Sequence, residues 1–315
     1  MAIPYEVRSV PGKGMGMFAT IAVLPGSAIL HENYTMNIAT QAGQLAEADI
    51  QDACNLLNVA EQEQFLSLHS SNKFPRYSLI YKIYRANSFE TGGLCTLLLG
   101  ISRVNHSCHP NAIVQFSDAQ QHASLVARKP IAEGEEISIT YKERDLASMV
   151  TYTRQRVLAH THGFWCICRL CQKMGSPATL SNMRRQLING LYQPLSGLQP
   201  FGHNSTTDAP GGLWEPARIS EPLTLWKRTM YYLLLANAQE AEGIDSIMTS
   251  QSYVSAAYCL LGQASRAGND VIVLQVARHV RELMRKAIWL ESSARGEVWW
   301  EHWLHGSSKW PNKRP

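Results

Sequence analysis

The chain has 315 residues, of which 45% are hydrophobic and 17% are charged. This is the composition of a folded protein rather than a disordered one, and the length allows one large domain or two modest ones with a substantial core. The formal net charge of +4 is too small to indicate binding to nucleic acid, and no run of lysine and arginine reinforces it.

The N-terminal sequence, MAIPYEVRSVPGKGMG, lacks the apolar core of a signal peptide, and no apolar run approaches the roughly 20 residues that span a bilayer. We therefore expect an intracellular protein, in the nucleus, the cytoplasm or both, that does not bind a membrane. Seven cysteines, an odd number, favour free thiols or metal ligands over a framework of disulfides.

Short strands are predicted in the first part of the chain. Two of them, residues 14–23 and 26–36, are separated by the turn signal Pro25-Gly26. In a later strand Tyr141 points to the same face as Ile137 and Ile139, because successive side chains of a strand alternate between its two faces. The later predicted strands are residues 111–117, 123–131 and 137–141.

Helices are predicted between and after these strands. About residues 41–72 repeat apolar side chains with a helical period, which indicates an inserted helical segment, and residues 143–160 are also predicted to be helical. Residues 193–222 contain five prolines and four glycines, and this composition predicts a linker or a long irregular loop.

The last part of the chain is predicted to be helical. Three apolar stripes with a helical period begin at Leu223, Val254 and Val273. Five of the eight tryptophans lie in the final stretch, and we expect them to close the end of a helical core rather than to bind a partner. They are Trp289, Trp299, Trp300, Trp303 and Trp310.

The strongest local motif is Cys166-x-Cys168-x-x-Cys171. Three thiols in six residues suit tetrahedral Zn²⁺, and cysteines two positions apart pair poorly as a disulfide. A closed structural site draws a fourth thiolate from elsewhere, for which Cys108 is the candidate. The alternative is a set of buried, reduced cysteines.

Two other segments are rich in groups that could meet a ligand. The glycines of PGKGMGMF, residues 11–18, would let backbone approach a ligand, although a tight turn is the simpler interpretation. In SRVNHSCHPN, residues 102–111, His106 and His109 could be metal ligands, hydrogen-bonded structural groups or, with Cys108, part of a nucleophilic pair. The hydrogen-bonded role is the favoured one.

Five motifs in this order resemble the SET-domain methyltransferases, which transfer a methyl group from S-adenosylmethionine to lysine side chains. The match covers about residues 5–172 and is nearest to the SMYD subgroup and its fungal relatives, although a short helical insert stands in place of the MYND zinc finger. The motifs are GKGMGMFAT at residues 12–20, ANSFE at 86–90, SRVNHSCHPN at 102–111, GEEISITY at 134–141 and GFWCICRLC at 163–171.

The resemblance implies a role for each matching residue. Tyr141 would be the catalytic tyrosine, which orients the neutral amine of a lysine inside a narrow apolar channel. Cys108, Cys166, Cys168 and Cys171 would hold one structural Zn²⁺. The residues expected at the cofactor are Gly14, Met15, Gly16, Asn87, Asn105, His106, Tyr141 and Phe164.

The resemblance also implies a local topology and exposes one departure. The NHSC segment would thread beneath the segment of the catalytic tyrosine to form a pseudoknot, so its polar groups would be buried in pairs. His162 stands where the family usually carries a second active-site tyrosine. Its imidazole would contact the substrate amine as a catalytic group, relax the product specificity or mark an impaired enzyme.

The fold class expected is α+β: a β-rich SET fold with a pseudoknot and a helical insert, a post-SET zinc cluster and an all-α C-terminal region. The expected domains are a SET domain at residues 1–145 with its insert at about 41–86, a post-SET helix and cysteine cluster at 146–175, a linker at 176–222 and a helical region at 223–315.

The resulting hypothesis is a monomeric protein-lysine N-methyltransferase that uses S-adenosylmethionine and acts on an accessible lysine of a protein, such as a histone. Two alternatives stay open. One is a catalytically weak SET protein that serves as a cofactor- or protein-binding module, and the other is a methyltransferase of a small amine.

Overall fold

The computed structural model describes residues 3–39, 45–73, 75–91, 94–117, 120–141, 146, 148–197, 221–244, 246–267 and 270–295. The chain divides into two compact units, Met1–Asn182 and Met183–Pro315. None of the helices in the described residues has the length and apolarity that crossing a membrane requires.

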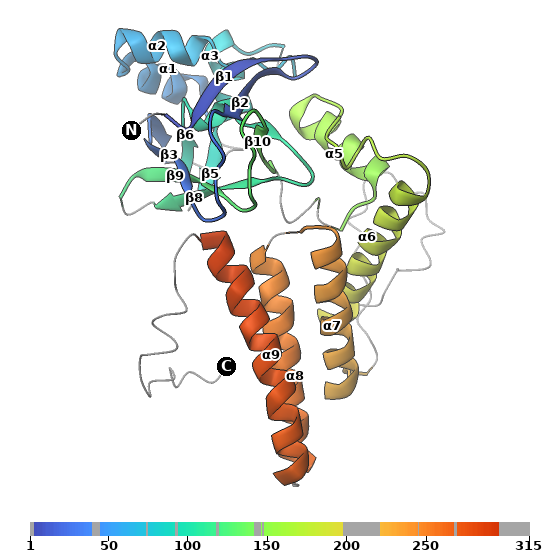
Figure 1. Ribbon diagram of the computed structural model, residues 1–315. Coiled ribbons are helices and arrows are strands. Elements are labelled where there is room, and N and C mark those ends of the chain that lie inside the picture. Colours follow the sequence, from blue (N-terminus) through green and yellow to red (C-terminus); the bar gives the residue numbers. More distant parts are fainter. Residues whose placement is uncertain are drawn as a thin grey trace. The chain divides into compact units, whose positions relative to one another are not determined.

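Three small sheets form the frame of the first unit (Figure 1). Their strand orders are β1-β2-β10-β7, β3-β9-β8 and β4-β6-β5, and the pairing of β7 with β10 is parallel. The predicted strands correspond to β2, β3, β8, β9 and β10, whereas β1 and the strands β4 to β7 were not predicted. The bounds are β1 Tyr5–Val10, β2 Gly14–Ala19, β3 Ala28–Asn33, β4 Met36–Ile38, β5 Phe89–Thr91, β6 Leu94–Leu97, β7 Asn105–His106, β8 Ala112–Ser117, β9 His122–Ala127 and β10 Glu136–Ile139.

The main core of this unit lies between the first two sheets. Met17 of β2, Leu125 of β9 and Ile137 of β10 are fully buried there. Tyr141 lies two residues beyond the end of β10 and packs against the same core, as the alternation of side chains along that strand predicts.

Three helices lie between β4 and β5: α1 Glu47–Asn55, α2 Val59–Leu66 and α3 Leu79–Asn87. Asn58 and Glu61 start α2 with a capping box, in which each side chain accepts the backbone N–H of the other residue. Phe65 of α2 and Ile83 of α3 join Leu97 of β6 in a second core, which fixes the helices to the β4-β6-β5 sheet. The helical insert expected here is present.

A short 3-10 helix, η1 Ile101–Arg103, precedes β7, and α5 Thr151–His162 follows the sheets. Gly163 ends α5 with a φ of +80°, a left-handed conformation that glycine adopts without strain. The loop that carries Cys166, Cys168 and Cys171 follows directly. Within the predicted helix over 143–160, Leu146 is helical, residues 148–150 are not, and α5 covers the rest from Thr151; residues 142–145 and 147 lie outside the described residues.

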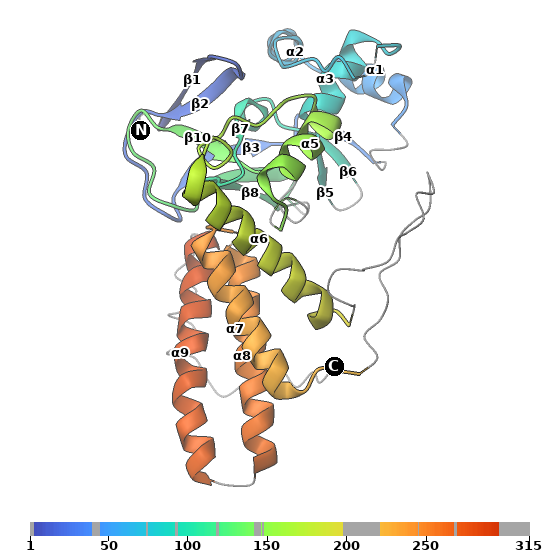
Figure 2. The same ribbon diagram turned by 90° about the vertical axis from the view of Figure 1, so that its right-hand side faces the viewer.

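The second unit is helical, as predicted, and α7, α8 and α9 lie side by side in it (Figure 2). Ile188 and Leu191 of α6 pack against Leu235 and Ala238 of α7. The helices are α6 Gly175–Leu195, α7 Leu225–Ala241, α8 Ser246–Ala267 and α9 Asp270–Arg295.

Two expectations for this part of the chain differ from the structure. The predicted linker over 176–222 begins with helix α6, and Pro194 is accommodated in its last turn; residues 198–220 lie outside the described residues. Trp289 is 64% exposed and therefore does not close a helical core. The other four tryptophans of the C-terminal stretch, Trp299, Trp300, Trp303 and Trp310, also lie outside the described residues.

Candidate functional site

A cavity of about 850 Å³ lies in the first unit, lined by residues of β2, α3, β7 and the segment around the end of α5. Its volume falls within the range of sites for small molecules and cofactors, roughly 300–1,000 Å³. Its lining includes His162 and seven of the eight residues predicted at the cofactor. These seven are Gly14, Met15, Asn87, Asn105, His106, Tyr141 and Phe164.

Gly16, the eighth, does not line the cavity itself but lies against the side chain of Asn105, which does. A Cβ atom on Gly16 would lie 2.7 Å from Val10 Cγ2 and 2.8 Å from Asn105 Nδ2, so only glycine leaves room for the Asn105 amide. Asn105 Nδ2 donates to the Met15 carbonyl at 3.1 Å and to Glu136 Oε1 at 3.0 Å. Because both amide hydrogens are used within the protein, Asn105 can offer a ligand its Oδ1 acceptor.

The side-chain NH₂ group of Asn87 is likewise hydrogen-bonded within the protein. Its Nδ2 donates to the carbonyls of His69 at 2.8 Å and Ile83 at 2.7 Å, and its own carbonyl accepts the Ser102 hydroxyl at 3.0 Å. These bonds fix the end of α3 to the segment that leads into β7. Asn87 therefore shapes the wall of the cavity and can face a ligand only through its remaining acceptor.

His106 connects the sheet to the segment of Tyr141. The Tyr141 backbone N–H donates to His106 Nδ1 at 3.1 Å, so the ring proton is on Nε2, which lies 3.3 Å from Cys108 Sγ and donates to it. Burial, the largest cause, lowers the pKa of His106 to about 4. The neutral imidazole therefore keeps both bonds at physiological pH.

The segments of His106 and Tyr141 run side by side, as the resemblance implied for the crossing. Ser107 N–H donates to the Ile139 carbonyl at 2.8 Å. Asn111 is the residue of this region whose role was not predicted: its Oδ1 accepts the Ser138 N–H at 2.8 Å and its Nδ2 donates to the Glu136 carbonyl at 2.9 Å. Most polar groups of SRVNHSCHPN are thus paired within the protein, with His106 and Asn111 buried and His109 exposed.

The Tyr141 hydroxyl donates to the Val104 carbonyl at 3.0 Å. Burial and, second, the charge of Glu136 raise the pKa of Tyr141 well above its ordinary value, so the phenol stays neutral. Three rings surround it, with centroid distances of 5.3 Å to His106, 5.2 Å to His162 and 6.1 Å to Phe164. The structure thereby places His162 next to Tyr141, in the position that the resemblance implied for a second active-site group.

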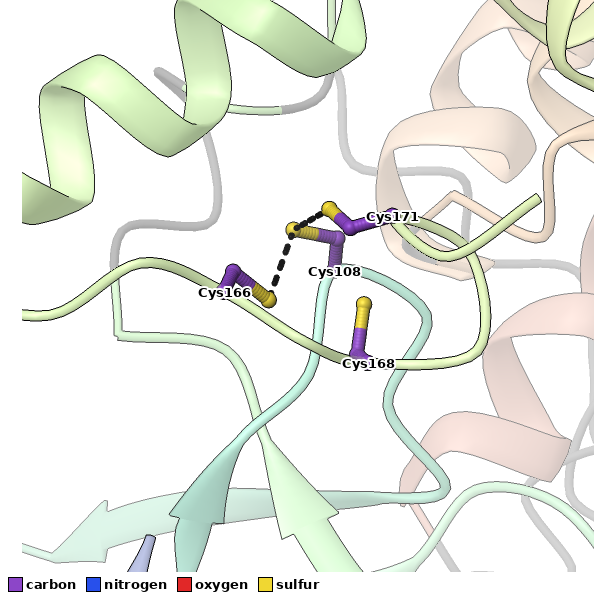
Figure 3. Close-up of side chains that lie close together, drawn as sticks. All are labelled: Cys108, Cys166, Cys168 and Cys171. Carbon is purple, nitrogen blue, oxygen red and sulfur yellow. Dashed lines mark hydrogen bonds between the residues drawn. The ribbon is translucent and has the colours of Figure 1, made fainter. Parts of the chain in front are cut away.

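The four predicted metal ligands lie together (Figure 3). Their sulfur atoms are all within 4.8 Å of one another, with Cys108 Sγ 3.8 Å from Cys166 Sγ and 3.6 Å from Cys171 Sγ. Cys108 follows β7, whereas the other three come from the loop after α5. Tetrahedral Zn–S bonds of about 2.3 Å place sulfurs about 3.8 Å apart. The cluster can therefore hold one Zn²⁺.

In the described part of the chain, this cluster consists of the four cysteines alone, and neither histidine of SRVNHSCHPN belongs to it. His106 contacts it from outside, and His109 is exposed, with Lys129 Nζ 3.0 Å from its Nε2. The geometry favours a metal ligand over a nucleophile for Cys108, because its thiol faces the three other thiols of the cluster. The bond from His106 holds that thiol in place.

Two further residues of the site were missed by sequence reasoning. Glu136 accepts bonds from Asn105 and from Lys13 Nζ, the latter at 2.6 Å, and so ties β10 to the turn before β2. Arg154 of α5 is fully buried beside the cysteine cluster. No local signal marks Arg154, since the sequence distinguishes it in no way from Arg156, which lies two positions later in the same predicted helix.

The chain was compared with known proteins. Residues 14–142 match the family model described as SET domain. Histone-lysine N-methyltransferase set5 of Schizosaccharomyces pombe is 32% identical over 188 residues, which are 58% of this chain and 56% of that protein. SET5 of Meyerozyma guilliermondii is 31% identical over 129 residues (40% of this chain, 24% of that protein), and ASHR1 of Arabidopsis thaliana is 38% identical over 77 residues (24% and 15%). The chain thus spans about half the length of the first relative and less of the other two.

Proposed function

We propose that the protein is an N-methyltransferase that uses S-adenosylmethionine and acts on lysine side chains of proteins, because residues 14–142 match the family model described as SET domain. The observation that carries the proposal is Tyr141, whose neutral hydroxyl is anchored on the Val104 carbonyl at the wall of the cavity. The relatives named above are histone-lysine methyltransferases, so a histone is the first substrate to test. A nuclear or cytoplasmic location and a monomeric state belong to the same proposal.

The cavity residues suit the cofactor. Gly14 has a φ of +80° and nothing within 4 Å of the place where a Cβ would lie, so the backbone of β2 stays open to a ligand. Asn105 Oδ1 suits a donor such as the cofactor's amino group, and Phe164 offers an aromatic surface to its adenine. When bound, the cofactor supplies an electrophilic methyl group on a sulfonium.

The chain's own residues would act on the substrate amine. A lysine ammonium has no lone pair with which to attack, and its ordinary pKa is about 10.4. Burial in the cavity disfavours the charged form and so favours release of the proton before transfer. Because the Tyr141 O–H is donated to Val104, its oxygen is left to accept an amine N–H and aim the lone pair. The tyrosine thus positions the amine and takes no proton.

His162 lies beside the Tyr141 ring, with the two ring centroids 5.2 Å apart, and lines the same cavity. We include it in the proposal as a second group that contacts the amine, in place of a tyrosine. A shorter imidazole leaves more space near the amine than a phenol would, so replacing His162 by tyrosine should lower the number of methyl groups transferred to one lysine.

The experiment is methyl transfer from labelled S-adenosylmethionine to histones, with free lysine as a small-amine acceptor. We expect Tyr141→Phe to lower the rate about 100-fold or more, the cost of losing one positioning group, while cofactor binding measured by calorimetry persists. Tyr152→Phe is the matched control, because Tyr152 is largely exposed on α5.

The outcomes separate the three hypotheses. Transfer to histones that depends on Tyr141 supports the proposal. Cofactor binding without any transfer would favour the binding module, and transfer confined to free lysine would favour a methyltransferase of small amines.

A further inference from the structure

Arg154 is a cation in an unusual place. Its residue is fully buried, 0% exposed, in the first turns of α5. Its Nη1 donates to the Met149 carbonyl at 2.6 Å and its Nη2 to Thr151 Oγ1 at 3.2 Å, while its Nε has no hydrogen-bond acceptor in the described part of the chain. All of these partners are neutral.

A buried guanidinium that meets only neutral groups is costly, because its charge has been removed from water without compensation. Among the described residues no carboxylate forms an ion pair with Arg154. The group that remains is sulfur: Arg154 Nη2 lies 3.7 Å from Cys171 Sγ. In the part of the chain that the structure describes, the cysteine cluster is the group beside Arg154 that can carry a compensating negative charge.

The cluster supplies a negative charge only when its thiols are ionised, and four thiols within 4.8 Å of one another repel as thiolates unless a cation lies between them. Zn²⁺ held by four thiolates leaves a net charge of −2 on the site. Arg154 would neutralise half of that charge across the N–H···S contact. The arginine therefore supplies positive charge to a site with a net charge of −2, and the site supplies the negative charge that the buried arginine needs.

We propose that Arg154 is the counter-ion of the four-cysteine metal site, and that it slows loss of the metal by holding Cys171 and neutralising part of the charge of the site. His106 provides a second N–H···S bond, to Cys108 on the other side of the cluster, but it is neutral. Of these two side chains that donate to the sulfurs in the described part of the chain, only Arg154 carries a positive charge. The inference concerns the metal site and does not depend on methyl transfer.

A purely structural role is the competing explanation, because Arg154 also ties Met149 and Thr151 at the start of α5. Charge and packing can be separated by two substitutions. Arg154→Lys keeps the positive charge and loses the planar donor group, whereas Arg154→Gln keeps an amide donor and loses the charge. Arg156→Met is the matched control, since Arg156 lies on the same helix and is exposed.

The measurement is the rate at which zinc passes from the purified, full-length protein to a coloured chelator under native conditions. We expect Arg154→Gln to release zinc about 10–100-fold faster than the unaltered protein, the usual effect of removing a partner of a metal ligand. Arg154→Lys should release it at a rate closer to the unaltered protein, and Arg156→Met at the same rate. A second readout is the sulfur-to-metal absorption band of the Co²⁺-substituted protein, which should shift in Arg154→Gln.

The proposal is overturned if both Arg154 variants are folded and release zinc as slowly as Arg156→Met. It is overturned as well if Arg154→Lys unfolds as completely as Arg154→Gln in excess zinc, because the side chain then acts by packing and not by charge. A protein that binds cofactor but transfers no methyl group would leave the zinc measurement unaffected.

Discussion

Replacing Cys108 by serine tests the metal site at the position that joins two distant parts of the chain. Cys108 follows β7, whereas the other three cysteines lie 58 or more residues later. Serine preserves the size of the side chain, and its oxygen can still accept the His106 Nε2–H bond. What it removes is a thiolate ligand, so the substitution separates metal binding from hydrogen bonding.

The expected loss can be worked out from the site. Structural zinc contributes about 10–16 kcal/mol in small zinc-binding peptides, and that free energy is folding free energy. Shared equally among four thiolates, each ligand accounts for about 3 kcal/mol. A domain of 150–250 residues, such as Met1–Asn182, loses about 2–4 °C of melting temperature per kcal/mol. Cys108→Ser should therefore lower the melting temperature of this unit by roughly 6–12 °C.

The assay is thermal unfolding with and without a chelator, together with metal analysis. The unaltered protein should contain one Zn²⁺ per chain and lose melting temperature when chelator is added. Cys108→Ser should contain clearly less zinc and respond little to the chelator. Cys259→Ser is the control, because Cys259 is a buried thiol of α8 outside the cluster. A Cys108→Ser protein with a full zinc content and an unchanged melting temperature would refute the reasoning.

Four further substitutions test the packing around the site, in the helical insert and in the second unit. Gly16→Ala should cost about 1–3 kcal/mol and weaken cofactor binding, because the new methyl group overlaps two side chains at under 3 Å; unchanged affinity by calorimetry would contradict this. Phe65→Ala should cost about 3–5 kcal/mol in denaturant unfolding, since Phe65 is fully buried in the core of the insert, and should leave the zinc content unchanged. Arg185→Met should cost about 3–5 kcal/mol because it leaves Glu242 buried without its 3.0 Å partner, whereas Arg184→Met, whose side chain is 44% exposed, should cost under about 1 kcal/mol. Equal losses at the two arginines would show that burial of the pair is not what matters.

The sequence predicted those parts of the fold whose periodicity is strong and local. Alternation along residues 137–141 correctly placed Tyr141 against the core, and the apolar stripes beyond residue 223 correctly gave helices α7 to α9. Strand β7 is two residues long, which is too short to show any period, and it exists because Asn105 and His106 pair with β10. Helix α6 was missed because residues 176–192 were joined to the proline- and glycine-rich stretch 193–222, of which α6 contains only the first three residues.

The candidate site, too, was predictable from the sequence only in part. The spacing of Cys166, Cys168 and Cys171 is readable from the sequence, and the need for a fourth ligand led to Cys108, which lies beside them. The position of Arg154 was not readable, because its partners are a carbonyl, a hydroxyl and a sulfur that only the tertiary structure brings together. Local sequence patterns identify functional groups that lie within a few residues of one another. They do not identify a single residue whose role depends on contacts made only in the tertiary structure.

The bonds of His106 explain why a cysteine of the cluster and residues that line the cavity share one short segment. An imidazole is planar and its two nitrogens point in different directions, so a partner at each nitrogen fixes both the position and the plane of the ring. Here one partner is the backbone N–H of Tyr141 and the other is the sulfur of Cys108. The place of the tyrosine backbone is thereby set from the cysteine cluster, through a side chain that burial keeps neutral. The same cluster holds the loop that follows Phe164 and His162. The four cysteines thus help to fix the segment of Tyr141 and the segment of His162 and Phe164, which line the same cavity.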